Sequence, residues 1–277
     1  MTYIDLSYAY GVMDASELDR LFAQTLESDY DDHEPWEAVS TLRSNGTNEI
    51  FDRAAAWCRS TEPLKQARGA DILSQLRLPP PAVKDKLWPD RLFPDESFAL
   101  IWTILDSAQS DLVVLSSIHA LGHLGFIAAV PIILRHLCNP NEDIRFAVAC
   151  ALGHFHNDPQ AIQALLRLMT DPDHDVRDWA TFGLGVLGEA DSLEIREALL
   201  QRLADPNEDV REEAAIGLGK RHEPRLLPVI LEMLDQPILK ERVAEAASAL
   251  LGLEQDPPEW EAQDYKAALK RHFSLQD

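Results

Sequence analysis

Apolar residues recur three and four positions apart through most of this chain, which is the spacing of one face of an α-helix. One such face comes from Leu18, Leu21, Phe22 and Leu26, and another comes from Ile144, Val148, Ala151 and Leu152. Prolines, glycines and short acidic stretches separate these faces. The pattern therefore predicts a chain of short amphipathic helices joined by tight connections.

The breaks place the first helices at residues 15–27, from Pro35 to the Asn45-Gly46 pair, at 47–59 and from Pro63 onward. Further helices are predicted at residues 96–107, 112–125, 127–137, 159–169, 192–203, 224–234, 240–251 and 258–272. Residues 1–11 have aromatics but no clear period, so an extended arm is expected there. Three prolines at 79–81 cannot continue a helix, and a short helix is predicted at residues 82–87.

One pattern occurs three times in the middle of the chain. The pattern occupies residues 139–145, 171–177 and 205–211. Each copy begins with Asn-Pro or Asp-Pro, continues with two further residues and an Asp, and ends with Ile-Arg or Val-Arg. A Leu-Gly pair follows each copy. The arginines are 32 and 34 residues apart. A fixed period of this length predicts stacked supersecondary units, each resting on its neighbours.

Each copy has the features of a helix start. The residue before proline is disfavoured in a helix, and proline lacks an N–H donor, so the preceding element ends there. The acidic residues that follow occupy the first turn, where their oxygens can accept from unpaired N–H groups and their charge suits the helix dipole. The small residues after the arginine allow neighbouring helices to approach closely.

This pattern resembles the short HEAT-like repeat of phycobilin lyase subunits and of many bacterial scaffold proteins. The resemblance implies an all-α, right-handed superhelix of about six or seven helix hairpins, with the second helices lining a concave surface. It also implies ladders of hydrogen bonds between repeats. On the matching positions, the ladder residues would be Asp143, Arg145, Asp175, Arg177, Asp209 and Arg211. Val114 stands at the arginine position of a less regular copy, so we expect the ladder to be interrupted at that repeat. In the last copy the arginine position holds Ala244.

The regularity of the pattern suggests four parts. Residues 1–78 are interpreted as degenerate amino-terminal repeats, 79–95 as a Pro-rich ordered insertion or a hinge, 96–255 as regular repeats, and 256–277 as a capping helix. An end unit of a solenoid must be atypical, because one of its faces meets water.

Charge narrows the choice of partner. The 277 residues carry 47 acidic and 25 basic side chains, a net charge of −22, with 46% hydrophobic residues. This charge would repel nucleic acid and anionic membranes, and it would attract a basic protein. No apolar run is long enough to span a bilayer, and the first ten residues lack the basic start of a signal peptide, so a cytoplasmic location is expected. Cys58, Cys138 and Cys150 have no paired or metal-type spacing and are expected to be reduced.

The familiar catalytic motifs do not occur in the sequence. It has no phosphate-binding loop, no Gly-x-Ser-x-Gly and no His-Glu-x-x-His. Gly183, Gly185 and Gly188 fit a dinucleotide fingerprint by spacing, but they end a repeat helix and follow no strand, so close packing explains them better. We therefore predict that the protein is not an enzyme and uses no cofactor.

Histidines provide an alternative. His119 and His123 lie four residues apart, and His154 falls in the column of His123, with His156 close by, so a His-bound metal is a competing hypothesis. Deoxyhypusine hydroxylases use His-Glu pairs within repeat helices, whereas the two pairs here, at His33 and His222, each precede a proline in a connection. No metal site is predicted. A phycobilin lyase-like chaperone-transferase stays open as a second alternative.

The strongest functional candidate is the predicted concave face. Aligning the copies shows four apolar residues at positions that the repeat usually fills with polar ones: Phe146, Trp179, Phe182 and Ile216. Three acidic residues flank them: Asp178, Glu212 and Glu213. Aromatic anchors among acids suit a basic protein partner. The alternative is that these rings pack between adjacent repeats. The sequence thus favours a protein-binding scaffold or inhibitor, one version being an immunity protein that neutralises a basic toxin.

Overall fold

A computed structural model describes residues 13–78, 90–253, 257 and 259–274. The predicted arm at residues 1–11 and the predicted helix at 82–87 lie outside the described residues. The chain divides into two compact units, residues 1–133 and residues 134–277. The four-part division drawn from the sequence stays a prediction.

The described part of the first unit is built from α-helices and one 3-10 turn: α1 (Ala15–Gln24), α2 (His33–Ser44), α3 (Asn48–Cys58), α4 (Pro63–Ser74), α5 (Pro94–Ser107), α6 (Asp111–Leu124), η1 (Ile127–Ala129) and α7 (Val130–Ile133). Asp14 caps α1 by accepting from the Glu17 N–H, and Thr47 caps α3 by accepting from the Ile50 N–H. Helix α4 packs against both α3 and α6. Its residues Ala67, Ala70 and Ile72 are fully buried, which makes α4 the centre of this unit's core.

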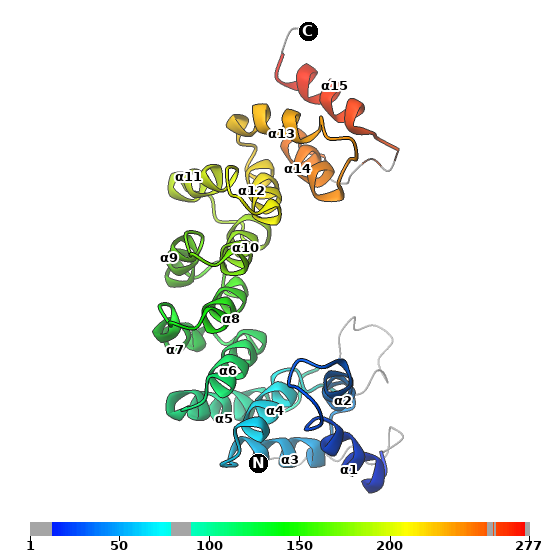
Figure 1. Cartoon of the computed structure of the whole chain (residues 1–277), viewed down its shortest axis with the longest axis vertical. Helices are drawn as coiled ribbons and strands as arrows, with labels where there is room; N and C mark the ends of the chain where they lie inside the picture. Colours follow the sequence, from blue (N-terminus) through cyan, green and yellow to red (C-terminus); the bar gives the residue numbers. More distant parts are fainter. Residues whose placement is uncertain (1–12, 79–89, 254–256, 258, 275–277) are drawn as a thin grey trace. The chain divides into compact units, whose positions relative to one another are not determined.

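The second unit continues the hairpins: η2 (Leu134–His136), α8 (Glu142–Gly153), α9 (Pro159–Leu168), α10 (His174–Phe182), η3 (Gly183–Leu187), α11 (Leu193–Arg202), α12 (Glu208–Lys220), η4 (Pro224–Leu226), α13 (Leu227–Met233), α14 (Glu241–Leu251) and α15 (Ala262–His272). Helices α8, α10, α12 and α14 pack in sequence and form what we call the second-helix row. In Figure 1, α9 and α11 lie side by side in a separate row.

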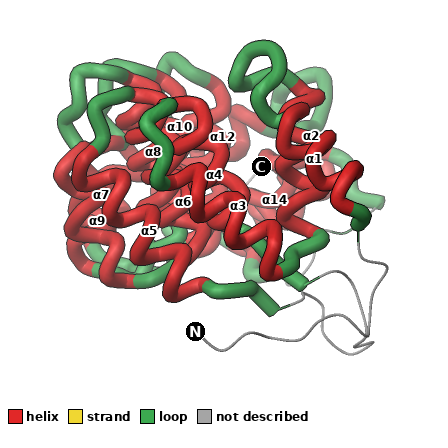
Figure 2. Tube along the Cα trace, turned by 90° about the horizontal axis from the view of Figure 1, so that it is seen from below, coloured by secondary structure: helices red, strands yellow, loops and turns green. Residues whose placement is uncertain are grey.

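The predicted all-α solenoid is confirmed. Figure 2 shows the described chain as helices and loops, without a strand; the one β-type contact among these residues is an isolated bridge between Arg77 and Arg91. Ile144, Val148 and Leu152 are completely buried, as their helical spacing predicts. None of the described helices is both long and apolar enough to cross a membrane.

Two predicted helices differ from the structure. The helix expected at residues 127–137 is divided into η1, α7 and η2. Pro131 has no N–H to donate to the carbonyl oxygen of Ile127, which accounts for the first division. The last turn of the α10 segment is a π-helix, η3, at Gly183–Leu187. Two of its glycines face backbone directly, since a Cβ on Gly183 would lie 3.2 Å from the Gly153 Cα, and one on Gly185 would lie 3.4 Å from the Gly217 Cα.

Candidate functional site

The predicted partner-binding residues all lie on the second-helix row of the second unit, and the repeat pattern fixes where each helix starts. Asn141 caps α8 by accepting from the Asp143 N–H at 2.9 Å. Asp173 caps α10 through the N–H groups of Asp175 and Val176, and Asn207 caps α12 through the Val210 N–H. Because each cap sits four residues before the repeat arginine, the side chains that follow the arginine recur on the same side of successive helices.

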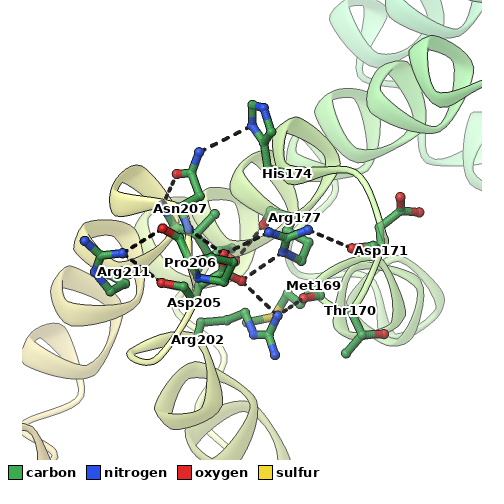
Figure 3. Close-up of polar contacts among 12 residues, drawn as sticks. Met169, Thr170, Asp171, His174, Arg177, Arg202, Asp205, Pro206, Asn207 and Arg211 are labelled. Atoms are coloured by element: carbon green, nitrogen blue, oxygen red, sulfur yellow. Dashed lines mark hydrogen bonds and ion pairs between the residues drawn. The ribbon is translucent and has the colours of Figure 1, made fainter.

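The repeat arginines join neighbouring repeats by bidentate ion pairs. Arg145 donates from Nε and Nη2 to the two carboxylate oxygens of Asp171, at 2.8 and 2.9 Å. Arg177 holds Asp205 with the same two nitrogens at the same distances. Figure 3 shows this second pair and the contact between Arg177 and Asp171. The remaining nitrogen, Nη1, donates to the carbonyl oxygens of Asp171 and Pro172. These contacts form a ladder between successive repeats, in which Arg145 and Arg177 are the donors.

The ladder aspartates are not the predicted ones. Asp143, Asp175 and Asp209 lie in the first turns of their helices and are exposed. The acceptors are Asp171 and Asp205, each of which precedes a proline. Each also accepts from the N–H two residues later, at 3.0 Å, so a local turn aims its carboxylate at the preceding repeat. The sequence carries this signal, because an Asp or Asn stands six residues before the arginine in all three copies.

The ladder arginines also shift the titration of their partners. Burial acts to raise the pKa of Asp171, but hydrogen bonds from Arg145 and from the Asp173 N–H outweigh it, and the pKa is lowered. The same balance, with Arg177 and the Asn207 N–H as donors, lowers the pKa of Asp205. Both carboxylates are therefore charged at neutral pH, as a bidentate arginine pair requires.

Three aromatic rings form a continuous edge-to-face series across two helices. The Phe146 and Trp179 ring centroids are 5.8 Å apart at 83°, and those of Trp179 and Phe182 are 5.6 Å apart at 75°. Trp179 remains 40% exposed. Phe146 and Phe182 are half-buried, so they hold the indole in place while one part of it meets water.

Ile216, the aliphatic residue among the predicted partner-binding residues, is not exposed as Trp179 is. Ile216 is only 2% exposed, because its position on α12 faces the interior of the row. The prediction that Ile216 contacts a partner is therefore not supported, and this residue belongs to the core.

Acidic residues gather beside the aromatic series. The carboxylate of Glu213 is 2% exposed and forms an ion pair with Arg242 of α14. Its other oxygen, Oε2, and Oδ1 of Asp178 are buried and have no hydrogen-bond partner among the described residues. We call Asp178, Asp209, Glu213, Arg242 and Glu245 the acidic cluster, since their charges act on one another.

Burial and mutual repulsion perturb the two buried carboxyls. Burial, with the charge of Asp209 next, raises the pKa of Asp178 to about 6, although Arg242 opposes the change. Burial raises the pKa of Glu213 to about 7, against the effect of Arg242 and with the help of Asp178, Glu245 and Asp209. In this group one arginine, Arg242, therefore faces four acidic side chains.

Glu212 is already engaged inside the protein. It is 6% exposed, and Lys240 lies 2.9 Å from its carboxylate and 2.7 Å from that of Glu208. Its carboxylate is therefore engaged within the protein, as one oxygen of Glu213 is with Arg242, whereas Asp178 is half-buried and forms no such pair among the described residues.

The histidines do not assemble into a metal site within the described ranges. His119 and His123 lie one turn apart on α6, and His154 follows the last residue of α8, where it is exposed. No group of three or more His, Cys, Asp or Glu side chains among the described residues has an arrangement suited to a metal ion. The prediction of no metal stays a prediction.

A second polar cluster, which the sequence reading missed, is buried in the first unit. Arg68 is 0% exposed and donates to the carbonyl oxygens of Thr25 and Tyr30, with its guanidinium 4.1 Å from the centroid of the Tyr30 ring. Asp71 accepts from the Tyr30 hydroxyl at 2.9 Å and from the Ser116 hydroxyl at 2.7 Å. This cluster joins α1, α4 and α6 through groups that water does not reach, so its role is structural.

A family model described as HEAT repeats matches residues 99–185 and 183–251 of the chain. Among solved structures, YibA of Escherichia coli is 22% identical with a TM-score of 0.64, and 95% of this chain and 100% of that chain are covered. Human deoxyhypusine hydroxylase in complex with glycerol is 17% identical with a TM-score of 0.36, covering 94% and 97%. The complex of CpcE and CpcF of phycocyanin lyase from Nostoc is 16% identical with a TM-score of 0.49, covering 97% and 100%. A search of curated protein sequences gives no match.

One prediction is corrected by these structures. The inference that the protein is not an enzyme is wrong as an exclusion, because the HEAT-type structures similar to this chain include a hydroxylase and a lyase complex. Missing catalytic motifs and a repeat fold do not together exclude catalysis.

Proposed function

Because the chain belongs to the HEAT-repeat family, we propose that it is a scaffold that binds a basic protein partner on its second-helix row. The contact centres on Trp179 and on the two carboxylates Asp178 and Glu213. HEAT-repeat chains present extended surfaces built from successive helices, and such surfaces commonly bind other macromolecules. The specific partner must follow from the side chains on the row.

The observation that carries the proposal is a pair of carboxylate oxygens without donors. Oδ1 of Asp178 and Oε2 of Glu213 are both buried, and no described residue donates to either. Leaving a buried acceptor without a hydrogen bond costs about 1–3 kcal/mol, and more when the group is charged. An arginine or lysine side chain of a partner would supply the missing donors and the missing positive charge.

The exposed indole supports the same class of partner. Trp179 is held at 40% exposure between two phenylalanines that pack against it edge to face. A cation over an indole face is stabilised by the ring quadrupole, by about 0.5–2 kcal/mol. A guanidinium is flat enough to stack there while its N–H groups point toward a carboxylate. Tryptophan at the centre of an interface is also a common binding hot spot.

Long-range charge favours the same partner. The chain has a net charge of −22, and residues 136–221 alone hold 16 acidic against 8 basic side chains. A field of this sign speeds encounter with a basic protein and disfavours acidic ones. The narrower version, neutralisation of a basic toxin by an immunity-type protein, stays a prediction that rests on charge.

The test begins with the intact chain used as bait in a lysate of its source organism, in low and in high salt. We expect a retained protein with a basic isoelectric point, released as salt screens the charges. Titration calorimetry with that partner should then show an affinity at least about tenfold lower for Trp179→Ala and for the double variant Asp178→Asn with Glu213→Gln.

The matched control is the double variant Glu142→Gln with Glu189→Gln, which removes the same two charges at exposed positions outside the acidic cluster. It should stay within about twofold of the wild-type affinity, since isolated surface charges contribute little. An acidic partner, or equal losses in both double variants, would overturn the proposal.

A further inference from the structure

The ladder of arginines ends with an arginine that has only half of its contacts. Arg211 donates from Nη1 to the carbonyl oxygens of Asp205 and Pro206, at 2.8 and 3.1 Å, as the two earlier arginines do with their own loops. In those arginines, Nε and Nη2 hold the aspartate of the next repeat. In Arg211 these two nitrogens have no hydrogen-bond or ion-pair partner among the described residues. Figure 3 shows the contacts of Arg211 with Asp205 and Pro206.

The sequence explains the missing partner. Asp171 and Asp205 each stand three residues before the first residue of the helix that follows, His174 of α10 and Glu208 of α12. Helix α14 begins at Glu241, so the same place in the next repeat belongs to Ile238. Its side chain is apolar and 78% exposed. Nε and Nη2 of Arg211, which we call the fork, could therefore bind a carboxylate, but the next repeat has no carboxylate at the matching position.

Arg211 lines a cavity of about 360 Å³ formed by α12, α13, the connection from α13 to α14 and the start of α14. Its wall includes Arg211, Ile238 and Lys240, and it is completed by the apolar side chains of Val229, Met233 and Val243. A cavity of this size holds a small organic group, and apolar side chains beside the unpaired nitrogens of Arg211 favour an acid on an aliphatic stem.

Acidic neighbours do not prevent an anion from binding here. Glu208 and Glu212 also line the cavity, but both are ion-paired with Lys240, whereas Glu232 has no such pair among the described residues. The ladder itself shows that an arginine of this chain holds a carboxylate in an acidic setting, because Arg145 binds Asp171 with Glu142 and Asp173 nearby.

We propose that this cavity binds a carboxylate carried on an aliphatic group, with the carboxylate placed on Arg211 as Asp205 is placed on Arg177. The two sources of this chemistry are a free branched-chain acid and the carboxy-terminal residue of a peptide that ends in leucine. The site is separate from the acidic cluster. Its ligand is negatively charged, whereas the partner proposed for the acidic cluster is positively charged.

Three probes test the site on the intact chain by NMR titration: 4-methylpentanoate, the tripeptide Ala-Ala-Leu, and the same tripeptide with an amidated carboxyl end. Saturable binding of the acid alone identifies a small-molecule site, and tighter binding of the free tripeptide identifies a peptide site. The amidated tripeptide should bind at least about tenfold more weakly than the free one, because a charge-assisted bidentate pair is lost. No saturable binding of either carboxylate, or equal binding of free and amidated peptide, overturns the proposal.

Two variants locate the binding on the fork. Arg211→Gln should weaken it at least about tenfold, whereas Arg167→Gln, which removes an exposed arginine of α9, should leave it unchanged. Ile238→Asp should restore the ladder within the chain, block the external carboxylate and raise the Tm. Binding that survives in both Arg211→Gln and Ile238→Asp would place the ligand elsewhere and defeat the proposal.

Discussion

At the scale of single residues, Glu213 makes stability depend on pH in an unusual direction. Its folded-state pKa of about 7 lies above the ordinary value of 4.5. Between those two values the folded chain binds more protons than the unfolded chain, so the free energy of unfolding falls as the pH rises through this window. The stability that the proton provides is present near pH 4.5 and lost above pH 7.

Glu213→Gln should therefore stabilise the protein at pH 8, on the order of 1–3 kcal/mol, and have a smaller effect at pH 5. Urea unfolding at the two values measures the difference. Glu142→Gln, at an exposed position, serves as the control and should change neither value appreciably. A Glu213→Gln variant that is equally stable or less stable than the wild type at pH 8 contradicts the assignment.

The ladder gives a second prediction, which separates the predicted aspartate from the observed one. Asp205→Ala should lower the free energy of unfolding by about 3–5 kcal/mol, because it leaves the buried Arg177 without its counter-ion. Asp209→Ala, four residues later and exposed, should change it by about 0.5 kcal/mol or less. Denaturant unfolding of the two variants measures both changes in the free energy of unfolding. Similar decreases in the two variants would favour Asp209, the aspartate predicted from the sequence, as a ladder residue.

The residues show why the arginines were predictable and the aspartates were not. Arg145 and Arg177 recur at the repeat period, which is sufficient to place them on the same side of successive helices. Two aspartates recur with the same period, and sequence spacing does not say which one turns toward the neighbouring repeat. A turn contact, from the N–H of Asp173 to Asp171, makes that choice. The ion pair of Arg242 with Glu213 is not predicted by the repeat pattern for a related reason, since Arg242 stands two residues before the aligned position, Ala244.

At the scale of the elements, helix packing depends on particular glycines. A Cβ on Gly217 of α12 would lie 2.6 Å from the Gly185 Cα of η3, whereas a Cβ on Gly153 of α8 would have its nearest neighbours at 3.7 Å. Gly217→Ala should therefore destabilise the protein by about 1–3 kcal/mol, since backbone must move apart. Gly153→Ala should be neutral or stabilising by up to about 1 kcal/mol, because alanine favours the helix. Thermal melts test the pair, and equal effects would contradict the packing described.

The sequence predicts the start of a helix well where a proline marks it. Pro63 and Pro159 begin α4 and α9 as predicted, because proline fits the first turn of a helix. The apolar spacing predicts one continuous helix across Pro131, whereas the segment is divided into η1, α7 and η2. The π-turn η3 had no local signal, since it depends on the backbones that pack against Gly183 and Gly185.

At the scale of the whole molecule, the chain consists of two compact units with separate buried polar anchors. In the first unit Arg68 and Asp71 are enclosed, and burial raises the pKa of Asp71. In the second unit the ladder pairs join α8 to α10 and α10 to α12. Because each repeat contacts mainly its neighbours, a substitution in the buried polar residues of one unit should destabilise that unit alone.

Hydrogen exchange on single-site variants measures that localisation. Arg68→Met removes the donors to Thr25 and Tyr30 and leaves the buried Asp71 with less compensation, so amides of α1, α4 and α6 should exchange at least about tenfold faster. Amides of α10 and α12 should keep their wild-type rates. Arg20→Met, an exposed arginine paired with Glu17 on the surface of α1, is the matched control and should leave both units unchanged. If Arg68→Met accelerates exchange equally in α10 and α12, the two units unfold as one, and the independence inferred from their separate cores is wrong.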